Sequence, residues 1–231
     1  MIGKISTMLT LIMFLITTFN CHSHKVAIPQ WLQQHRQQRL AQFKNENKQL
    51  NKQNYTILLG NSITEGFPVE TYFVDQPVLN RGIVADHSGI EGNGILQRLK
   101  VSVFDCKASK VFLMIGINDL ADKIFTPGQI ANGVKLIVQK IQQFDPNIKI
   151  YLQSALPTAG KYTYLNKMVL EFNQYLKKTA DELKLTYIDL YPHFVNYTGE
   201  MQAQLGRDGL HLTDEGYKIW YQLILPYLGD K

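Results

Sequence analysis

From residue 55 onward the chain alternates between short apolar runs and longer segments with apolar residues at helical spacing. Continuous apolar runs that end at a glycine or a polar loop are typical of strands buried on both faces of a sheet. Five such runs predict strands at 55–59, 77–79, 110–115, 148–153 and 185–190. Helical patterns occupy about 90–102, 127–144, 163–184 and 213–227. This alternation predicts an α/β fold in which helices cover both faces of a five-stranded parallel sheet.

The segment 25–54, which precedes the first strand, is rich in Gln, Lys, Arg and Asn. Trp31 and Phe43 belong to a set of apolar residues near the helical period, and Pro29 stands where a helix can begin. We predict one basic helix here that packs on the domain formed by residues 55–231. Its basic face is either an ordinary solvated surface or a surface that binds to membranes, and we prefer the first interpretation.

The first twenty residues have the pattern of an export signal. Lys4 is followed by about fifteen mostly apolar residues without charge, which is typical of a secretory signal peptide and short for a membrane span. Two processing routes are open: cleavage after Ser23, or a bacterial lipoprotein signal that leaves Cys21 as the lipid-bearing residue. We therefore expect a signal in residues 1–23 and a periplasmic or secreted protein, whose membrane attachment would be a lipid on Cys21.

The distribution of charge changes the meaning of the net charge of +5. Seven of the 24 Lys and Arg residues lie before Tyr55, against the single acid Glu46, so 17 basic and 18 acidic residues remain in the domain. A nearly neutral domain argues against nucleic acid as a partner. Two cysteines, Cys21 and Cys106, exclude a disulfide-stapled mini-protein and a Cys-rich zinc module.

Four polar motifs follow predicted strands or precede the last helix. They are Gly60-Asn61-Ser62, Asn80-Arg81-Gly82, Gly116-Ile117-Asn118 and Asp208-Gly209-Leu210-His211. Each motif alone is ordinary turn or capping chemistry. Parallel sheets bind ligands at the carboxyl ends of their strands, so the four motifs together predict one functional site at that edge.

Ser62, Gly82, Asn118 and His211 stand in the order of the four blocks that define the SGNH hydrolases, also called GDSL esterases and lipases. Over residues 55–228 the chain resembles this family, and above all its bacterial branch related to the catalytic subunit of platelet-activating-factor acetylhydrolase. The resemblance implies a flavodoxin-like three-layer α/β/α sandwich that hydrolyses esters without a cofactor. We also expect no metal, because no pair of His or Cys residues has ligand spacing with a carboxylate at hand.

Two positions depart from the family pattern. Asn61 stands where the family name has Asp, and we expect activity to survive because the two side chains are isosteric and this residue is outside the catalytic triad. Val84-Ala85 stands where a glycine often follows the second block, which would narrow the acyl pocket.

The chemistry assigns a role to each residue. Ester attack by the Ser62 hydroxyl needs a base within hydrogen-bond reach, and the imidazole of His211 suits that role near neutral pH. Asp208, three residues earlier, can fold back and hold the imidazole in one tautomer. The oxyanion that forms needs donors, which we assign to the backbone N–H groups of Ser62 and Gly82 and the side-chain amide of Asn118.

We therefore predict an exported serine esterase that acts on short-chain acyl esters, chiefly acetyl esters, of carbohydrates or similar polar alcohols. A lysophospholipase or a general lipase-like acylhydrolase is the alternative among enzymes, favoured if the chain is lipid-anchored. A non-catalytic binding module on the same fold is the alternative of another class. Its mark would be a broken triad, whereas Ser62, Asp208 and His211 are all present.

Overall fold

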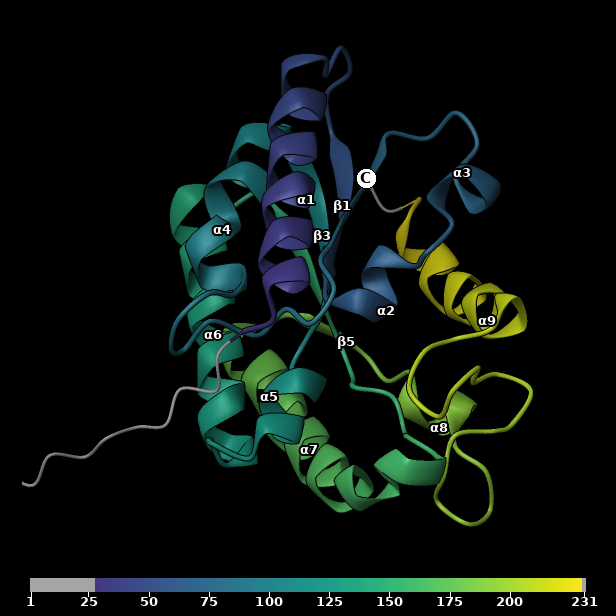
Figure 1. Cartoon of the computed structure of the whole chain (residues 1–231). Helices are drawn as coiled ribbons and strands as arrows, with labels where there is room; N and C mark the ends of the chain where they lie inside the picture. The colour runs from purple at the N-terminus through teal and green to yellow at the C-terminus, as the bar shows by residue number, and fades with distance from the viewer. Residues whose placement is uncertain (1–27, 230–231) are drawn as a thin grey trace, which may run out of the picture.

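The sheet follows the predicted alternation of strands and helices. A computed structural model describes residues 28–229. Its sheet is five-stranded and all-parallel, with the order β2-β1-β3-β4-β5. The strands are β1 (Tyr55–Gly60), β2 (Val78–Gly82), β3 (Ala108–Met114), β4 (Lys149–Gln153) and β5 (Thr186–Ile188). The predicted α/β/α sandwich is confirmed (Figure 1).

Alternate residues of each central strand enter two different hydrophobic cores, because successive side chains of a strand point to opposite faces. In β1, Ile57 and Leu59 enter the core covered by α4, α6 and α7. Leu58 enters the core on the other face, covered by α2, α8 and α9. The helices on the two faces are α4 (Ile95–Ser102), α6 (Pro127–Phe144), α7 (Asn166–Leu183), α2 (Ser62–Glu65), α3 (Val69–Tyr72), α8 (Tyr191–Phe194) and α9 (Asp214–Ile224).

Short helices are where the structure differs from the expected pattern. Helix α5 (Ile117–Asp122) and helix α8 were not predicted, because six and four residues are too few to show a helical period. Helix α4 begins at Ile95 and not near residue 90, after a turn in which the backbones of Gly89 and Gly94 pack closely. Short 3-10 helices occupy Phe104–Cys106, Gly160–Leu165 and Leu225–Tyr227.

Helix α1 (Gln30–Lys48) begins directly after Pro29 and packs on the domain. Phe43 is fully buried against Ile83 and Val101, and the guanidinium of Arg81 lies 4.6 Å from the centre of its ring. The apolar face expected for this helix is only partly realised. Trp31 is 61% exposed, and polar side chains of the helix such as Arg36 and Asn47 contact the domain.

The carboxyl ends of the strands meet at one edge, as the site prediction requires. Gly60 pairs with Gly82 on one side and with Met114 on the other. Helices α2 and α5, and the loop before α8, start from this edge, toward the lower end of the molecule in Figure 1.

The expected signal over residues 1–23, including Cys21, lies outside the described residues. Within residues 28–229 no helix combines the length and the apolar character needed to cross a membrane.

Candidate active site

Ser62 is the first residue of α2 and lies just beyond the end of β1. The side chain of Asn61 caps this helix by accepting a hydrogen bond from the N–H of Ile63 at 3.0 Å. The cap starts a helix immediately after the strand, and a helix N-terminus favours negative charge nearby. Asn61 thus has a local structural role beside Ser62, and either Asn or Asp can fill it.

Ser62, His211 and Asp208 are brought together by the structure. His211 Nε2 lies 3.0 Å from Ser62 Oγ, and His211 Nδ1 lies 2.8 Å from Asp208 Oδ2. The second carboxylate oxygen of Asp208 accepts the backbone N–H groups of Leu210 and His211 at 3.0 and 2.8 Å. The result is a continuous chain from hydroxyl through imidazole to carboxylate.

The environment of Asp208 keeps its carboxylate charged. Burial acts to raise its pKa, but the hydrogen bonds from the His211 backbone and imidazole and from the Leu210 N–H outweigh burial and lower the pKa to about 2. A carboxylate that stays ionised can hold a proton on Nδ1 of His211 and leave Nε2 free to accept one.

Asn118 lies in the first turn of α5, after Gly116, whose φ of 116° lies in the region that favours glycine. Its side-chain Nδ2 donates to the backbone oxygen of Asp86 at 2.8 Å. The next residue, Asp119, is buried and accepts hydrogen bonds from the Ser88 N–H and hydroxyl. The first turn of α5 is therefore tied to segment 86–88 at two adjacent positions.

Gly82 stands in a different setting from the one predicted. It is buried, and its N–H donates to Asn80 Oδ1 at 2.9 Å. The amide nitrogen of Asn80 donates to the carbonyl groups of Thr64, Glu65 and Phe67. A Cβ on Gly82 would collide with the backbone of Glu65. The N–H of Gly82 is thus already engaged, and its assignment as an oxyanion donor gains no support from this geometry.

Ala85 has an unusual backbone conformation beside the candidate site, which the sequence analysis did not predict. Its φ is 56°, which is unusual for a residue with a side chain, and within the described residues its N–H has no hydrogen-bond partner. It lies next to Asp86, which holds the Asn118 side chain. The available signal was the family pattern, which often has a glycine in this stretch.

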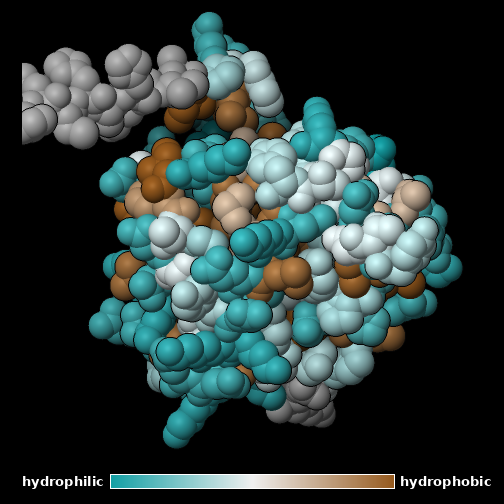
Figure 2. Space-filling model, turned by 90° about the horizontal axis from the view of Figure 1, so that it is seen from below, coloured by the Kyte–Doolittle hydropathy of each residue, from teal (hydrophilic) through white to brown (hydrophobic). Residues whose placement is uncertain are grey.

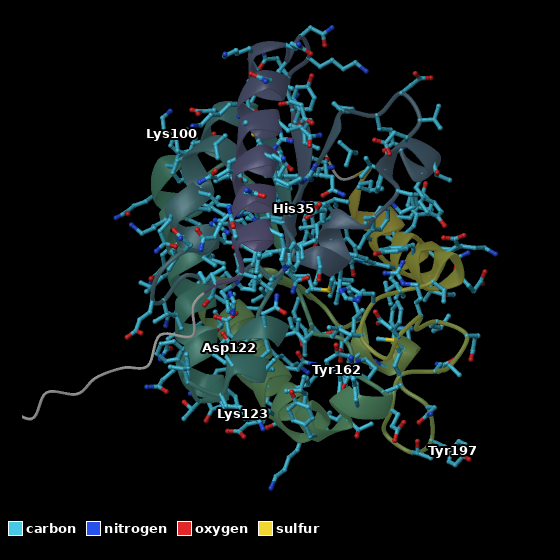
Figure 3. The ribbon with its side chains drawn as sticks, viewed as in Figure 1. His35, Lys100, Asp122, Lys123, Tyr162 and Tyr197 are labelled. Carbon is cyan, nitrogen blue, oxygen red and sulfur yellow. The ribbon has the colours of Figure 1, made fainter. Side chains whose placement is uncertain are left out.

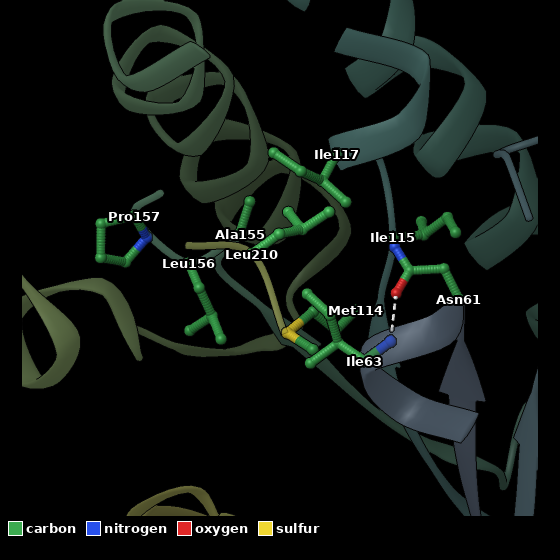
Figure 4. Close-up of a pocket in the computed structure, with 9 residues that line it drawn as sticks. All are labelled: Asn61, Ile63, Met114, Ile115, Ile117, Ala155, Leu156, Pro157 and Leu210. Carbon is green, nitrogen blue, oxygen red and sulfur yellow. Dashed lines mark hydrogen bonds between the residues drawn. The ribbon is translucent and has the colours of Figure 1, made fainter. Parts of the chain in front are cut away.

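A small apolar hollow lies among the neighbours of the candidate residues (Figure 4). Ile63 follows Ser62, Ile117 precedes Asn118 and Leu210 precedes His211 in the chain. The remaining lining residues are Asn61, Met114, Ile115, Ala155, Leu156 and Pro157. The space open to the centre of a water-sized sphere is about 10 Å³, so the hollow is small.

Other side chains at this end of the molecule give no sign of a metal site. Among residues 28–229, no group of three His, Cys, Asp or Glu side chains could hold a metal ion. Tyr162 packs partly against the core, whereas Tyr197 is fully exposed; both are labelled at the lower end in Figure 3.

The fold and the site together define a class. A serine hydroxyl, an imidazole and a carboxylate in hydrogen-bonded sequence, at the carboxyl edge of a parallel sheet, form the arrangement of α/β serine hydrolases. The sequence around Ser62 differs from the nucleophile elbow of the α/β-hydrolase fold. The elbow has the pattern Gly-x-Ser-x-Gly, whereas here Thr64 stands at the position of the second glycine.

The sequence pattern of the GDSL-like lipase/acylhydrolase family matches residues 58–219, and the chain belongs to this family of carboxylic ester hydrolases. A rat relative, platelet-activating factor acetylhydrolase IB subunit alpha2 from Rattus norvegicus, is 30% identical over 158 residues, which are 66% of this chain and 66% of the relative.

Two solved structures show the same fold. A GDSL-like lipase from Bacteroides thetaiotaomicron is 22% identical, with a TM-score of 0.73 over 82% of this chain and 96% of its own. An acetyl xylan esterase is 20% identical, with a TM-score of 0.63 over 75% of this chain and 98% of its own.

Proposed function

We propose that the enzyme hydrolyses short-chain acyl esters, chiefly acetyl esters, of carbohydrates or similarly polar alcohols, and that Ser62, His211 and Asp208 carry the reaction. The observation that supports this most is the 3.0 Å contact between Ser62 Oγ and His211 Nε2. A serine hydroxyl becomes a nucleophile at neutral pH when a base within this distance can take its proton.

The reaction has two halves. In the first, Ser62 Oγ bonds to the ester carbonyl carbon while His211 Nε2 takes the hydroxyl proton, and His211 then gives this proton to the departing alcohol. In the second, His211 deprotonates a water that attacks the acyl-Ser62 ester, and it then returns this proton to Ser62 Oγ as the carboxylic acid leaves. Asp208 holds the Nδ1 proton and stabilises the imidazolium in both halves.

Negative charge on the carbonyl oxygen needs donors in each half. We propose the N–H of Ser62 and the side-chain amide of Asn118, as the sequence predicted. For a third donor the N–H of Ala85 is the better candidate, because that of Gly82 is occupied by Asn80. Gly82 then serves the close packing of β2 on α2.

The size of the apolar hollow supports a short acyl group. Only about 10 Å³ of the hollow is open to the centre of a water-sized sphere, so it suits a small acyl group such as acetyl better than a long chain. Ile63 and Leu210, which line it, are neighbours in sequence of Ser62 and His211. An acyl group on Ser62 would therefore have its terminal methyl group in this hollow.

The surface at the end toward which the carboxyl ends of the strands point supports a polar alcohol. Seen from below, hydrophilic residues dominate this face and hydrophobic residues form only small, scattered groups (Figure 2). A long-chain lipase needs a broad apolar groove, whereas a sugar needs polar surroundings. The fold is also shared with an acetyl xylan esterase, whose name describes an acetyl ester of a carbohydrate.

We also propose that the enzyme acts outside the cytoplasm. The support is the sequence of residues 1–20, one lysine followed by an uncharged and mostly apolar run.

Substrate preference is tested with p-nitrophenyl esters of increasing chain length and with acetylated xylo-oligosaccharides. We expect kcat/KM to be highest for the acetyl ester and to fall beyond four carbons. Ser62→Ala should abolish turnover without loss of fold, while Ser109→Ala, at the opposite end of the sheet in β3, should leave the rate unchanged.

Three results would contradict the proposal in different ways. A chain-length optimum at eight carbons or more would favour the lipase alternative. Substantial activity in Ser62→Ala would refute the nucleophile. Tight binding of acetylated sugars without any hydrolysis would favour the non-catalytic module.

A further inference from the structure

Helix α1 lies before the region that matches the family pattern, yet its polar side chains contact the turn next to the candidate oxyanion site. Arg36 forms an ion pair with Asp86 through Nη1, and its Nη2 donates to the backbone oxygen of Gly94 at 3.2 Å. The Asp86 side chain is completely buried and that of Arg36 is 17% exposed. A pair so shielded from water is far less weakened by salt than a surface ion pair.

Asp86 is also bound from the other side by a residue of the domain itself. Arg98, in α4, donates from Nε to the second carboxylate oxygen of Asp86 at 2.7 Å. Arg98 Nη2 donates to the backbone oxygen of Gly60, two residues before Ser62, at 3.0 Å. Each carboxylate oxygen of Asp86 therefore has its own guanidinium, and one of the two is contributed by α1.

The backbone of Asp86 connects this ionic cluster to the candidate site. Its carbonyl oxygen accepts one N–H of the Asn118 amide at 2.8 Å. Because the amide is planar, this hydrogen bond determines where its second N–H points. A displacement of Asp86 would thus rotate the Asn118 amide and change the direction in which its second N–H points.

The other end of the same turn is also held by α1. Glu65 Oε2 accepts the backbone N–H of Val84 at 2.6 Å. Glu65 Oε1 lies 2.9 Å from His35 Nε2 and 3.5 Å from Arg39 Nε. His35, on α1, is labelled in Figure 3. Helix α1 therefore holds the turn from Val84 to Asp86 at both ends. Arg36 contacts Asp86 directly, whereas His35 acts on Val84 through Glu65.

We infer that α1 is a positioning element of the active site, in which Arg36 acts through Asp86 to orient the oxyanion-binding amide of Asn118. This inference rests on the proposed serine-esterase function. Arg36 is a positioning residue and touches no substrate. If Arg36 is removed, Asp86 keeps Arg98 as its partner, so the fold should persist while the turn loses its second anchor.

The first measurement is the kinetics of Arg36→Met with p-nitrophenyl acetate. We expect kcat to fall about 10-fold with little change in KM, since the affected donor acts on charge that exists only in the transition state. Loss of an oxyanion donor, about 10²–10³-fold in rate, is the upper limit. Arg36→Lys, which keeps the charge without the forked geometry, should recover part of the rate.

Lys44→Met is the matched control, because it removes one positive charge from the exposed side of the same helix. Its kcat and KM should equal those of the unmodified enzyme. A drop in kcat shared by Lys44→Met and Arg36→Met would assign the effect to the charge of α1 in general and would overturn the role of Arg36.

A double-mutant cycle with Asn118→Ala decides whether Arg36 acts through Asn118. We expect Arg36→Met to slow Asn118→Ala clearly less than it slows the unmodified enzyme, because the amide that it orients is already gone and only the N–H of Ala85 is left to be displaced. An equal slowing in both backgrounds, or an unchanged kcat in Arg36→Met, would overturn the inference. If Arg36→Met does not fold by circular dichroism, the same cycle with Arg36→Lys decides.

The failure of this inference is distinguishable from failure of the proposed function. Absence of Ser62-dependent hydrolysis in the unmodified enzyme would refute the function, and with it the inference. Normal Ser62-dependent hydrolysis with no coupling between Arg36 and Asn118 would refute only the positioning role.

Discussion

The carboxylate of Asp208 is partly exposed and still has a pKa lowered to about 2, because burial, which raises it, is outweighed by the hydrogen bonds of His211 and Leu210. This carboxylate is therefore ionised at every pH at which an imidazole titrates. A lowered pKa in the folded state also means that its contribution to stability is present above about pH 4, the ordinary range of an Asp, and is lost as the pH falls toward 2.

A pH-rate profile tests the role of Asp208. The logarithm of kcat/KM should rise with unit slope on the acidic side and then level off, because Asp208 stays ionised throughout this range and adds no second titration. Asp208→Asn should lower the rate sharply, by up to about 10⁴-fold, because the wrong tautomer is then allowed. Steady-state kinetics between pH 4 and 9 measure both effects.

Asp214→Asn serves as the matched control for this carboxylate. Asp214 lies three residues after His211, in the first turn of α9, and is exposed. Its replacement should leave kcat/KM nearly unchanged. A silent Asp208→Asn beside an inactive Asp214→Asn would show that a different carboxylate partners the imidazole.

Single residues also show where the sequence was insufficient. Ser62, Asp208 and His211 could be proposed from residue type and spacing, because each lies in a motif of three or four consecutive residues that is visible in the sequence. The engagement of the Gly82 N–H could not be predicted, since Asn80 could equally have turned its side chain to solvent. The positive φ of Ala85 likewise follows from the path of the turn and not from its residue type.

At the scale of elements, β2 and α2 approach each other closely at Gly82. The site of its missing Cβ is occupied by the backbone of Thr64 and Glu65. Asn80 reinforces the contact by donating to three carbonyl groups in and just after the last part of α2, those of Thr64, Glu65 and Phe67. Because backbone cannot move aside as a flexible side chain can, this contact leaves no room for a methyl group.

Gly82→Ala should therefore lower the free energy of unfolding by about 2 kcal/mol or more, as measured by urea denaturation. Gly128→Ala is the control, because this glycine lies in α6 near the half-exposed ring of Tyr175 and alanine favours helix. It should be neutral or slightly stabilising. Equal stability of Gly82→Ala and the unmodified enzyme would show that α2 can move away at little cost.

Elements of different length were predicted with different success. The strands and the long helices α6 and α7 came from patterns that extend over many residues, such as the apolar run of β3 (Ala108–Met114). Helix α5 was not found, because its six residues begin with Ile117 and Asn118, which read equally well as a loop with a cap. Its position depends on the long-range hydrogen bonds of Asn118 and Asp119.

At the scale of the whole molecule, α1 is joined to the domain by one buried ring and several ion pairs. Phe43 is fully buried, between the guanidinium groups of Arg39 and Arg81. Arg81 in turn is completely buried and forms an ion pair with Glu46 of α1. Removing these contacts would leave a buried guanidinium without its carboxylate, which is costly.

Phe43→Ala should lower the free energy of unfolding by about 3 kcal/mol, in a single cooperative transition if α1 and the domain form one folding unit. Urea denaturation followed by far-UV circular dichroism and by tryptophan fluorescence measures this. Trp31 and Trp220 report on α1 and on the core, respectively. Two separate transitions would show instead that α1 unfolds independently of the sheet.

The helix that anchors the Val84–Asp86 turn has a consequence for transplanting the site. A designer who copies the site on the segment from Tyr55 onward would copy Asp86 without Arg36 and Glu65 without His35. The graft would carry every reacting atom and still hold its amide donor loosely. A transferable unit of this enzyme therefore begins at Gln30, 25 residues before its first strand.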